Sequence, residues 1–126
     1  MPVRKISEVK KFTLPGIVHQ TLAGPEQGVK SFEVWLETVS PGAGTPVHRH
    51  KCEEFFVVLR GSGLLTIEDR NYPFGPDTTL IVPPDTTHQV INNGSEDLYF
   101  LVVLGMAPAQ ATTPEGQPIP LPWQQS

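Results

Sequence analysis

Three histidines and one glutamate are spaced so that together they could bind a metal ion. His48 and His50 are separated by one residue, and Glu54 follows four residues later. Side chains two or four residues apart on a β-strand point the same way, so these three could converge on one point. We expect His88, which follows a Pro-Pro-Asp turn, to supply a fourth ligand from a neighbouring strand. Imidazole nitrogens and a carboxylate oxygen commonly bind divalent first-row metals, so the set predicts one such ion.

Short β-strands must position these ligands, because the apolar residues recur with period two. Residues 31–39 show this best, since Trp35 and Glu37 there share one strand face. The 14 prolines and 11 glycines lie between apolar runs, which favours tight turns over helices. We expect strands at residues 17–22, 31–39, 64–68, 78–82, 87–91 and 98–104, and one bent strand or two over residues 47–59. Such a series predicts an all-β sandwich or barrel.

The length of 126 residues suits one domain, which we divide into three parts. Residues 1–13 are expected to form an N-terminal arm, and residues 14–107 the barrel. Residues 108–126 are rich in proline and should form an extended tail. A tryptophan on a disordered tail would be wasteful, so we expect Trp123 to pack back on the barrel.

Composition excludes several classes of protein. A formal net charge of −4 and a pI near 5.5 argue against nucleic-acid binding. No apolar run approaches the ~18 residues of a membrane span, so we expect no membrane partner. Cys52 is the only cysteine, so no intrachain disulfide can form, and we expect a small buried hydrophobe there. The N-terminal residues have no apolar core of a secretory signal, which favours a cytoplasmic location. His19 is expected at the surface or at a sheet edge.

Two motifs resemble those of the cupin family. The first is Gly42-x5-His48-x-His50-x3-Glu54-x6-Gly61, and the second is Pro83-x-Asp85-x2-His88-x3-Asn92. The resemblance implies a jelly-roll barrel, also called a double-stranded β-helix, and its spacing favours Glu54 over Glu53 as the ligand. Asp85 stands where cupins have glycine, and their leading glycine falls at Asp77 or is displaced to Gly75. Aspartate tolerates a left-handed turn better than most residues, so only the loop geometry is affected.

Residues 14–108 also resemble the plant auxin-binding proteins, through the segments 33–36, 40–42, 45–50, 52–54 and 88–90 among others. The resemblance implies a zinc ion held by His48, His50, Glu54 and His88. In that family the hormone's carboxylate meets the zinc and its ring lies in an apolar pocket. The matching pocket positions are Trp35, Glu37, Thr45, Pro46 and Phe56, and Trp123 corresponds to a tail tryptophan that closes the pocket.

Glu37 departs from that family, which has glutamine at the corresponding position. A carboxylate there would repel an anionic ligand by roughly 1–4 kcal/mol at a few ångströms. Glu37 could be protonated, could lie off the pocket, or could serve as a general base. Trp35 and Phe56 could line the pocket wall or simply fill the core.

These features leave two main functional interpretations. In the first, a zinc ion anchors a small aromatic carboxylate and nothing is catalysed. In the second, manganese, iron or nickel supports a dioxygenase or isomerase reaction, with Glu37 as the general base. A sugar-phosphate isomerase is a weaker third alternative, since only Arg49 and Arg60 would be near the pocket. Either way we expect a small organic acid as partner and a homodimer, because oligomers of this kind are commonly twofold.

Overall fold

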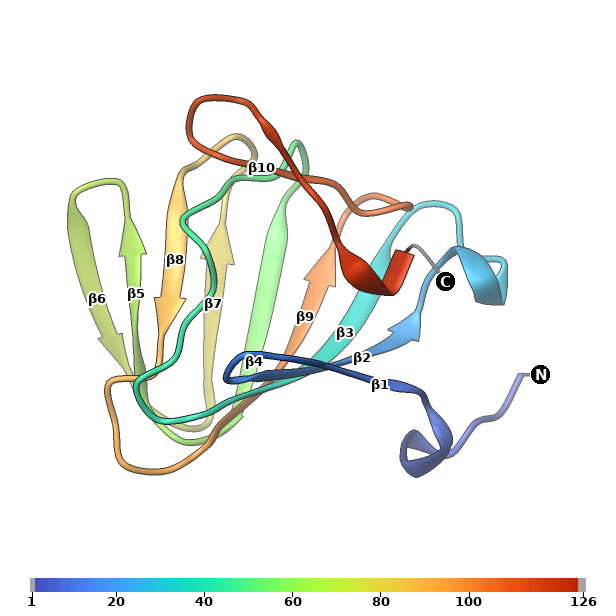
Figure 1. Ribbon diagram of the computed structural model, residues 1–126, viewed down its shortest axis with the longest axis horizontal. Helices are drawn as coiled ribbons and strands as arrows, with labels where there is room; N and C mark the ends of the chain where they lie inside the picture. The colour runs from blue at the N-terminus through green and yellow to red at the C-terminus, as the bar shows by residue number, and fades with distance from the viewer. Residues whose placement is uncertain (1, 125–126) are drawn as a thin grey trace.

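The computed structural model describes residues 2–124 and consists almost entirely of antiparallel strands, which confirms the all-β prediction (Figure 1). Among these residues, no helix has the length and apolar character needed to cross a membrane. In chain order the elements are η1 (Ile6–Glu8), β1 (Lys11–Leu14), β2 (Ile17–Ala23), η2 (Pro25–Gln27), β3 (Glu33–Val39), β4 (Glu54–Arg60), β5 (Gly63–Ile67), β6 (Arg70–Phe74), β7 (Thr78–Val82), β8 (His88–Ile91), β9 (Leu98–Leu104), β10 (Ala111–Thr112), β11 (Pro118–Ile119) and η3 (Pro122–Gln124).

Two sheets form the walls of the molecule. The larger has the strand order β1-β2-β3-β9-β4-β7, and the smaller has the order β6-β5-β8 (Figure 1). Strand β7 belongs to the large sheet and β8 to the small one, although only five residues separate them in the chain. The chain therefore passes repeatedly from one sheet to the other, as in a jelly roll.

The core lies between the two sheets and follows from the alternation within each strand. In β9, Leu98, Phe100, Val102 and Leu104 are buried, while the residues between them are partly exposed. The same cluster includes Leu65 and Val90 of the small sheet and Phe56, Val58, Leu80 and Val82 of the large one. Period two thus places one face of each strand in a shared interior.

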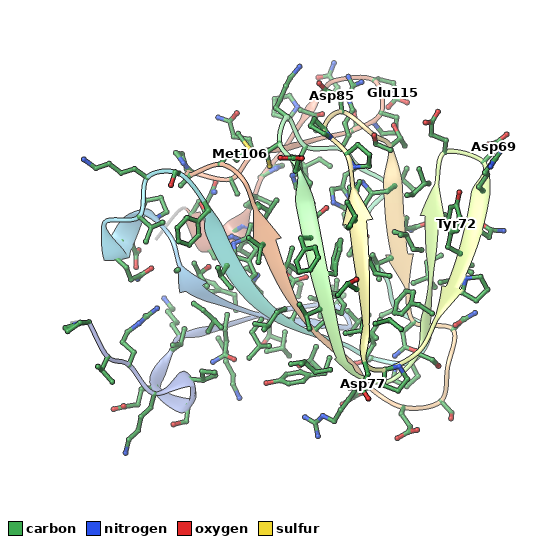
Figure 2. The ribbon with its side chains drawn as sticks, turned by 180° about the vertical axis from the view of Figure 1, so that it is seen from behind. Asp69, Tyr72, Asp77, Asp85, Met106 and Glu115 are labelled. Atoms are coloured by element: carbon green, nitrogen blue, oxygen red, sulfur yellow. The ribbon has the colours of Figure 1, made fainter. Side chains whose placement is uncertain are left out.

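Left-handed backbone at two aspartates shapes both ends of β7. Asp77 has φ 58° and Asp85 has φ 55°, and Figure 2 shows them at opposite ends of the barrel. Asp85 stands at a glycine position of the cupin motif, and Asp77 is one of two candidates for its leading glycine. The left-handed φ of Asp85 confirms the expectation that aspartate tolerates this conformation there. Gly61 has φ 86°, and a Cβ atom there would lie 2.5 Å from the Asp97 carbonyl oxygen. Glycine is therefore required at that motif position.

Both chain ends contain more strand structure than the sequence suggested. Strand β1 pairs with β2, so the large sheet begins inside the expected N-terminal arm. In the tail, β10 and β11 form a short antiparallel pair, whereas we expected an extended chain throughout. Arg49 exchanges two backbone hydrogen bonds with Thr112, which fastens this pair to the barrel. The prolines do not prevent it because Gly116, with φ 89°, provides the turn between the two strands.

Candidate metal centre

The four expected ligands meet in the interior of the barrel. One ligand atom from each of His48, His50, Glu54 and His88 can be chosen so that all lie within 4.8 Å of one another. All four side chains are buried. Glu54 is the first residue of β4 and His88 is the first residue of β8, so the large and the small sheet each contribute a ligand.

The spacing of His48, His50 and Glu54 had suggested one regular strand, but these residues do not share one. His48 forms an isolated bridge with His88, with backbone N···O distances of 3.0 and 2.8 Å. This bridge ties His48 to the small sheet, whereas Glu54 lies in the large one. The chain crosses between the sheets in the bend at residues 51–52. The ligands converge because the two sheets meet here, and the period of a single strand is not the cause.

Backbone carbonyls fix the orientation of all three imidazole rings. The Nδ1 atoms of His48, His50 and His88 lie 2.6, 2.7 and 2.9 Å from the carbonyl oxygens of Pro46, Gln110 and Thr86, respectively. A carbonyl only accepts hydrogen bonds, so each Nδ1 must carry the proton. With Nδ1 engaged in this way, Nε2 of each ring is left for the cluster, which is the arrangement of a metal-binding histidine with a backbone partner.

Glu54 is the negative charge of this cluster. Its Oε1 atom lies 2.8 Å from His88 Nε2 and 3.6 Å from His50 Nε2. Burial alone would raise the pKa of Glu54, but the hydrogen bond from His88 and the charges of the three imidazoles lower it overall. Burial also disfavours a charged His88, yet its bond to Glu54 raises the pKa of His88. The carboxylate is therefore ionised at neutral pH.

The chemistry of the cluster fits a divalent cation. Burial and the neighbouring His88 lower the pKa of His48 to about 4, which keeps this ring neutral and available as a ligand. His50 Nε2 is buried and has no hydrogen-bond partner among residues 2–124. A buried polar atom without a partner is costly, and a metal ion would satisfy it. These four residues could therefore hold a metal ion.

A cavity of about 80 Å³, which we call the metal pocket, adjoins this cluster. His48, His50 and Glu54 form part of its wall. All six residues expected to bind a ligand also line it, namely Trp35, Glu37, Thr45, Pro46, Phe56 and Trp123. The sequence reasoning missed five further lining residues, Leu14, Ile17, Ala111, Ile119 and Leu121. Three of these belong to the tail, whose path over the pocket no local pattern indicates.

His19 is a correction to the sequence reasoning. We expected a surface or edge residue, but His19 is fully buried, with 0% exposure. Its Nδ1 atom lies 2.8 Å from Glu37 Oε2, and its Nε2 atom lies 2.7 Å from Thr21 Oγ1. Trp123 stacks on the imidazole, with ring centroids 3.5 Å apart and an interplanar angle of 11°. The two hydrogen bonds and the stacked ring offset the cost of burying this polar side chain.

Comparison with known proteins identifies the family. A family model described as auxin binding protein matches residues 1–120. The chain belongs to the auxin-binding protein family. Auxin-binding protein 1 of Arabidopsis thaliana is 42% identical over 118 residues, which cover 84% of this chain and 60% of that protein. The chain therefore spans less than two thirds of the length of this relative.

Solved structures confirm that this family member is a cupin. The polyketide cyclase RemF from Streptomyces resistomycificus has a TM-score of 0.76 at 26% identity, covering 86% of this chain and 83% of that one. A cupin 2 domain-containing protein from Halorhodospira halophila has a TM-score of 0.71 at 28% identity, covering 79% and 70%. Both resemblances proposed from the sequence motifs, to cupins and to auxin-binding proteins, are thus confirmed.

Proposed function

We propose that this protein binds a small aromatic carboxylate at a metal ion held by His48, His50, Glu54 and His88. The observation that carries the proposal is the position of this cluster. Its buried nitrogen and oxygen atoms lie at one wall of a cavity that is otherwise mainly apolar and aromatic. A metal ion there would supply the positive charge that attracts a carboxylate. Relatives described as auxin-binding proteins are consistent with such a ligand.

The pocket walls suit a flat ring attached to the carboxylate. Trp35 of β3 and Phe56 of β4 lie on either side of β9, since both pair with its Val102. Both side chains are buried in the core, and both line the metal pocket. The sequence had left open whether Trp35 and Phe56 line the pocket wall or fill the core, and these two interpretations are compatible. Aromatic faces favour offset or edge-on contact with another ring.

The size of the metal pocket implies that the tail moves when a ring enters. Its volume of about 80 Å³ is well below the roughly 300–1,000 Å³ of ordinary ligand pockets. A carboxylate group fits such a space, but an indole or phenyl ring needs more. Trp123 is the wall residue best placed to yield, because it lies at the end of the tail and is only partly buried. Removing this side chain by Trp123→Ala should speed ligand association.

We also propose zinc as the metal and a homodimer as the assembly. The ligand set of three imidazoles and one carboxylate suits zinc, and manganese, iron and nickel are the alternatives. The cytoplasmic location expected from the sequence stays a prediction.

Elemental analysis and thermal unfolding test this proposal together. Protein purified without added metal should contain zinc, and indole-3-acetate or benzoate should raise its melting temperature. The metal-free protein provides the control, because the same acids should then have no effect. A protein that holds its metal but is not stabilised by either acid would contradict the proposal.

A metal-dependent isomerase or dioxygenase is the second candidate, and Glu37 is the observation that favours it. This carboxylate lines the metal pocket and is bonded to buried His19, an arrangement that suits proton transfer to or from a bound substrate. The similar polyketide cyclase shows that the fold supports an enzyme. Iron in the purified protein, with turnover that Glu37→Gln abolishes, would favour this candidate over simple binding.

A further inference from the structure

Two consecutive hydrogen bonds form a line beside the metal pocket. The first joins Glu37 Oε2 to His19 Nδ1 at 2.8 Å, and the second joins His19 Nε2 to Thr21 Oγ1 at 2.7 Å. The three residues lie on the neighbouring strands β2 and β3, where His19 is directly opposite Glu37. The line uses both nitrogens of a ring that is fully buried.

The two ends of this line open onto different cavities. Glu37 lines the metal pocket, and Thr21 lines a second cavity of about 380 Å³. Trp123 lines both cavities and stacks on the His19 ring between them. The buried imidazole therefore forms a polar connection between the two cavities.

We propose that Glu37, His19 and Thr21 form a proton relay that takes up one proton when a carboxylate binds in the metal pocket. This inference rests on the proposed function, because an anionic ligand is what drives the uptake. The incoming anion lies near the hydrogen-bonded pair of Glu37 and His19. A proton added to this pair makes its net charge more positive, so the ligand and the proton bind more strongly together than separately.

The geometry allows the proton to arrive without any rearrangement. In the starting state, His19 Nδ1–H donates to Glu37, and the Thr21 hydroxyl donates to Nε2. Thr21 passes its proton to Nε2, while its oxygen accepts another from a water molecule entering the second cavity, and the buffer acid returns a proton to that water. His19 is then cationic, donates to both neighbours, and forms a neutral pair with the Glu37 carboxylate. Trp123 stabilises the cation further, because its ring face lies 3.5 Å from the imidazole centroid.

Other charged and titratable groups lie farther from the relay. Glu37 is the one charged side chain that bonds to His19 within the described part of the chain. Phe12 of β1 and Trp35 of β3 contact the imidazole edge-on and carry no charge. The remaining groups face one cavity or the other: His48, His50 and Glu54 at the metal pocket, and Arg4, Lys10, Glu26 and Glu33 at the second cavity.

Calorimetry of the zinc-loaded protein tests the uptake directly. Benzoate or indole-3-acetate is titrated at one neutral pH in buffers with different heats of ionisation, and the difference gives the protons exchanged. We expect uptake of about one proton per ligand for the natural protein. Glu37→Gln should abolish uptake, because glutamine keeps an acceptor for Nδ1–H but carries no charge. Binding without uptake by the natural protein would overturn the relay and leave the proposed function intact.

Two substitutions at position 21 separate the relay from a structural role. Thr21→Val removes the oxygen that must accept Nε2–H from the cationic ring, so proton uptake should fall. Thr21→Ser retains the hydroxyl and should restore uptake to that of the natural protein. Equal uptake by the Val and Ser variants would exclude Thr21 from the relay.

Nuclear magnetic resonance tests the pair even without a ligand. The geometry predicts a slowly exchanging Nδ1–H proton on His19, held by the Glu37 carboxylate. Glu37→Gln should change the chemical shift of this proton, because the charged acceptor is replaced by a neutral one. Identical spectra of His19 in the two proteins would refute the coupling. Failure of both acids to bind would refute the proposed function separately.

Discussion

Backbone carbonyls prepare the metal cluster residue by residue. Each of its three imidazoles is bonded through Nδ1 to a carbonyl oxygen, at Pro46, Gln110 and Thr86, so Nε2 is the nitrogen left for a metal ion. The rings thus keep their orientation and tautomer before any ion arrives. The entropy of ordering the side chains is lost when the protein folds, which leaves more of the binding energy for the metal.

The two adjacent glutamates provide a matched test of the ligand set. Glu54 is buried beside His88, whereas its neighbour Glu53 is exposed and lies outside the cluster. Glu54→Gln should weaken zinc binding by more than about 100-fold, since losing an outer partner alone costs about 10–100-fold. Glu53→Gln should leave zinc binding unchanged. Competition with a coloured chelator measures both affinities, and equal losses would exclude Glu54 as the specific ligand.

The pKa of His48 predicts how acid affects the metal-free protein. Burial and the charge of His88 lower this pKa from 6.5 to about 4, so the unfolded chain binds the proton more tightly than the folded one. The contribution of His48 to stability should be constant above pH 6.5 and fall between pH 6.5 and 4, by at most about 3 kcal/mol. Urea unfolding across this range measures the loss. A His48→Gln variant should show a smaller loss, and an equal one would contradict the assignment.

The spacing within the two motifs was enough to predict which four residues cluster, but it could not predict the partner of His19. The ligands belong to two motifs with fixed gaps, and cupin loops bring those motifs together. His19 meets Glu37 only because β2 and β3 pair in one particular register. A polar residue at an inward position cannot be distinguished from a surface residue until its partner on another strand is known.

At the level of elements, the tail completes the site. Strands β10 and β11 and the turn η3 carry Ala111, Ile119 and Trp123 to the metal pocket, and in Figure 1 this segment crosses the end of the barrel. Its hairpin could not be predicted, because five prolines in residues 108–122 argue against regular structure. Contacts to the barrel, such as the paired bonds between Arg49 and Thr112, override that local preference.

Glu33 connects this tail to the large sheet, and its removal should weaken the fold. Its two carboxylate oxygens accept from Trp35 Nε1 at 2.8 Å and from the Ala109 amide at 2.6 Å. Glu33→Ala leaves both buried donors without partners, so the free energy of unfolding should drop by roughly 2–6 kcal/mol. Urea unfolding tests this, with exposed Glu26→Ala as the control. A loss of the same size in both variants would refute the role of Glu33.

For the whole molecule, the number and spacing of the strands were sufficient to predict an all-β fold, and the motifs to identify a cupin. The volume of the metal pocket was not predictable. It depends on how far Trp123 and Leu121 of the tail reach into the space between the sheets. Such packing is determined by the whole structure, since one methylene more or less changes a cavity of about 80 Å³ noticeably.

We expect two copies of the protein to associate through the outer face of the large sheet. Phe55 of β4 lies opposite Ile81 of the edge strand β7, and Ile81 is 66% exposed. An exposed apolar edge favours pairing with another chain. Light scattering after size-exclusion chromatography should give twice the chain mass, and Ile81→Lys should give the single mass. Gln27→Lys, at a distant turn, should remain dimeric, and a natural protein of single mass would refute the homodimer.

The bond between His50 Nδ1 and the Gln110 carbonyl oxygen joins a metal ligand to the C-terminal segment. We expect a bound metal ion to hold His50, and through this bond the segment around Gln110, in place. If a metal ion occupies the cluster, the metal-free protein should release this segment more often and be cleaved there more readily by a protease. We therefore expect the cellular half-life of the protein to shorten under chelation, which pulse-chase labelling can measure. Nutrient supply would then regulate abundance without any change in transcription.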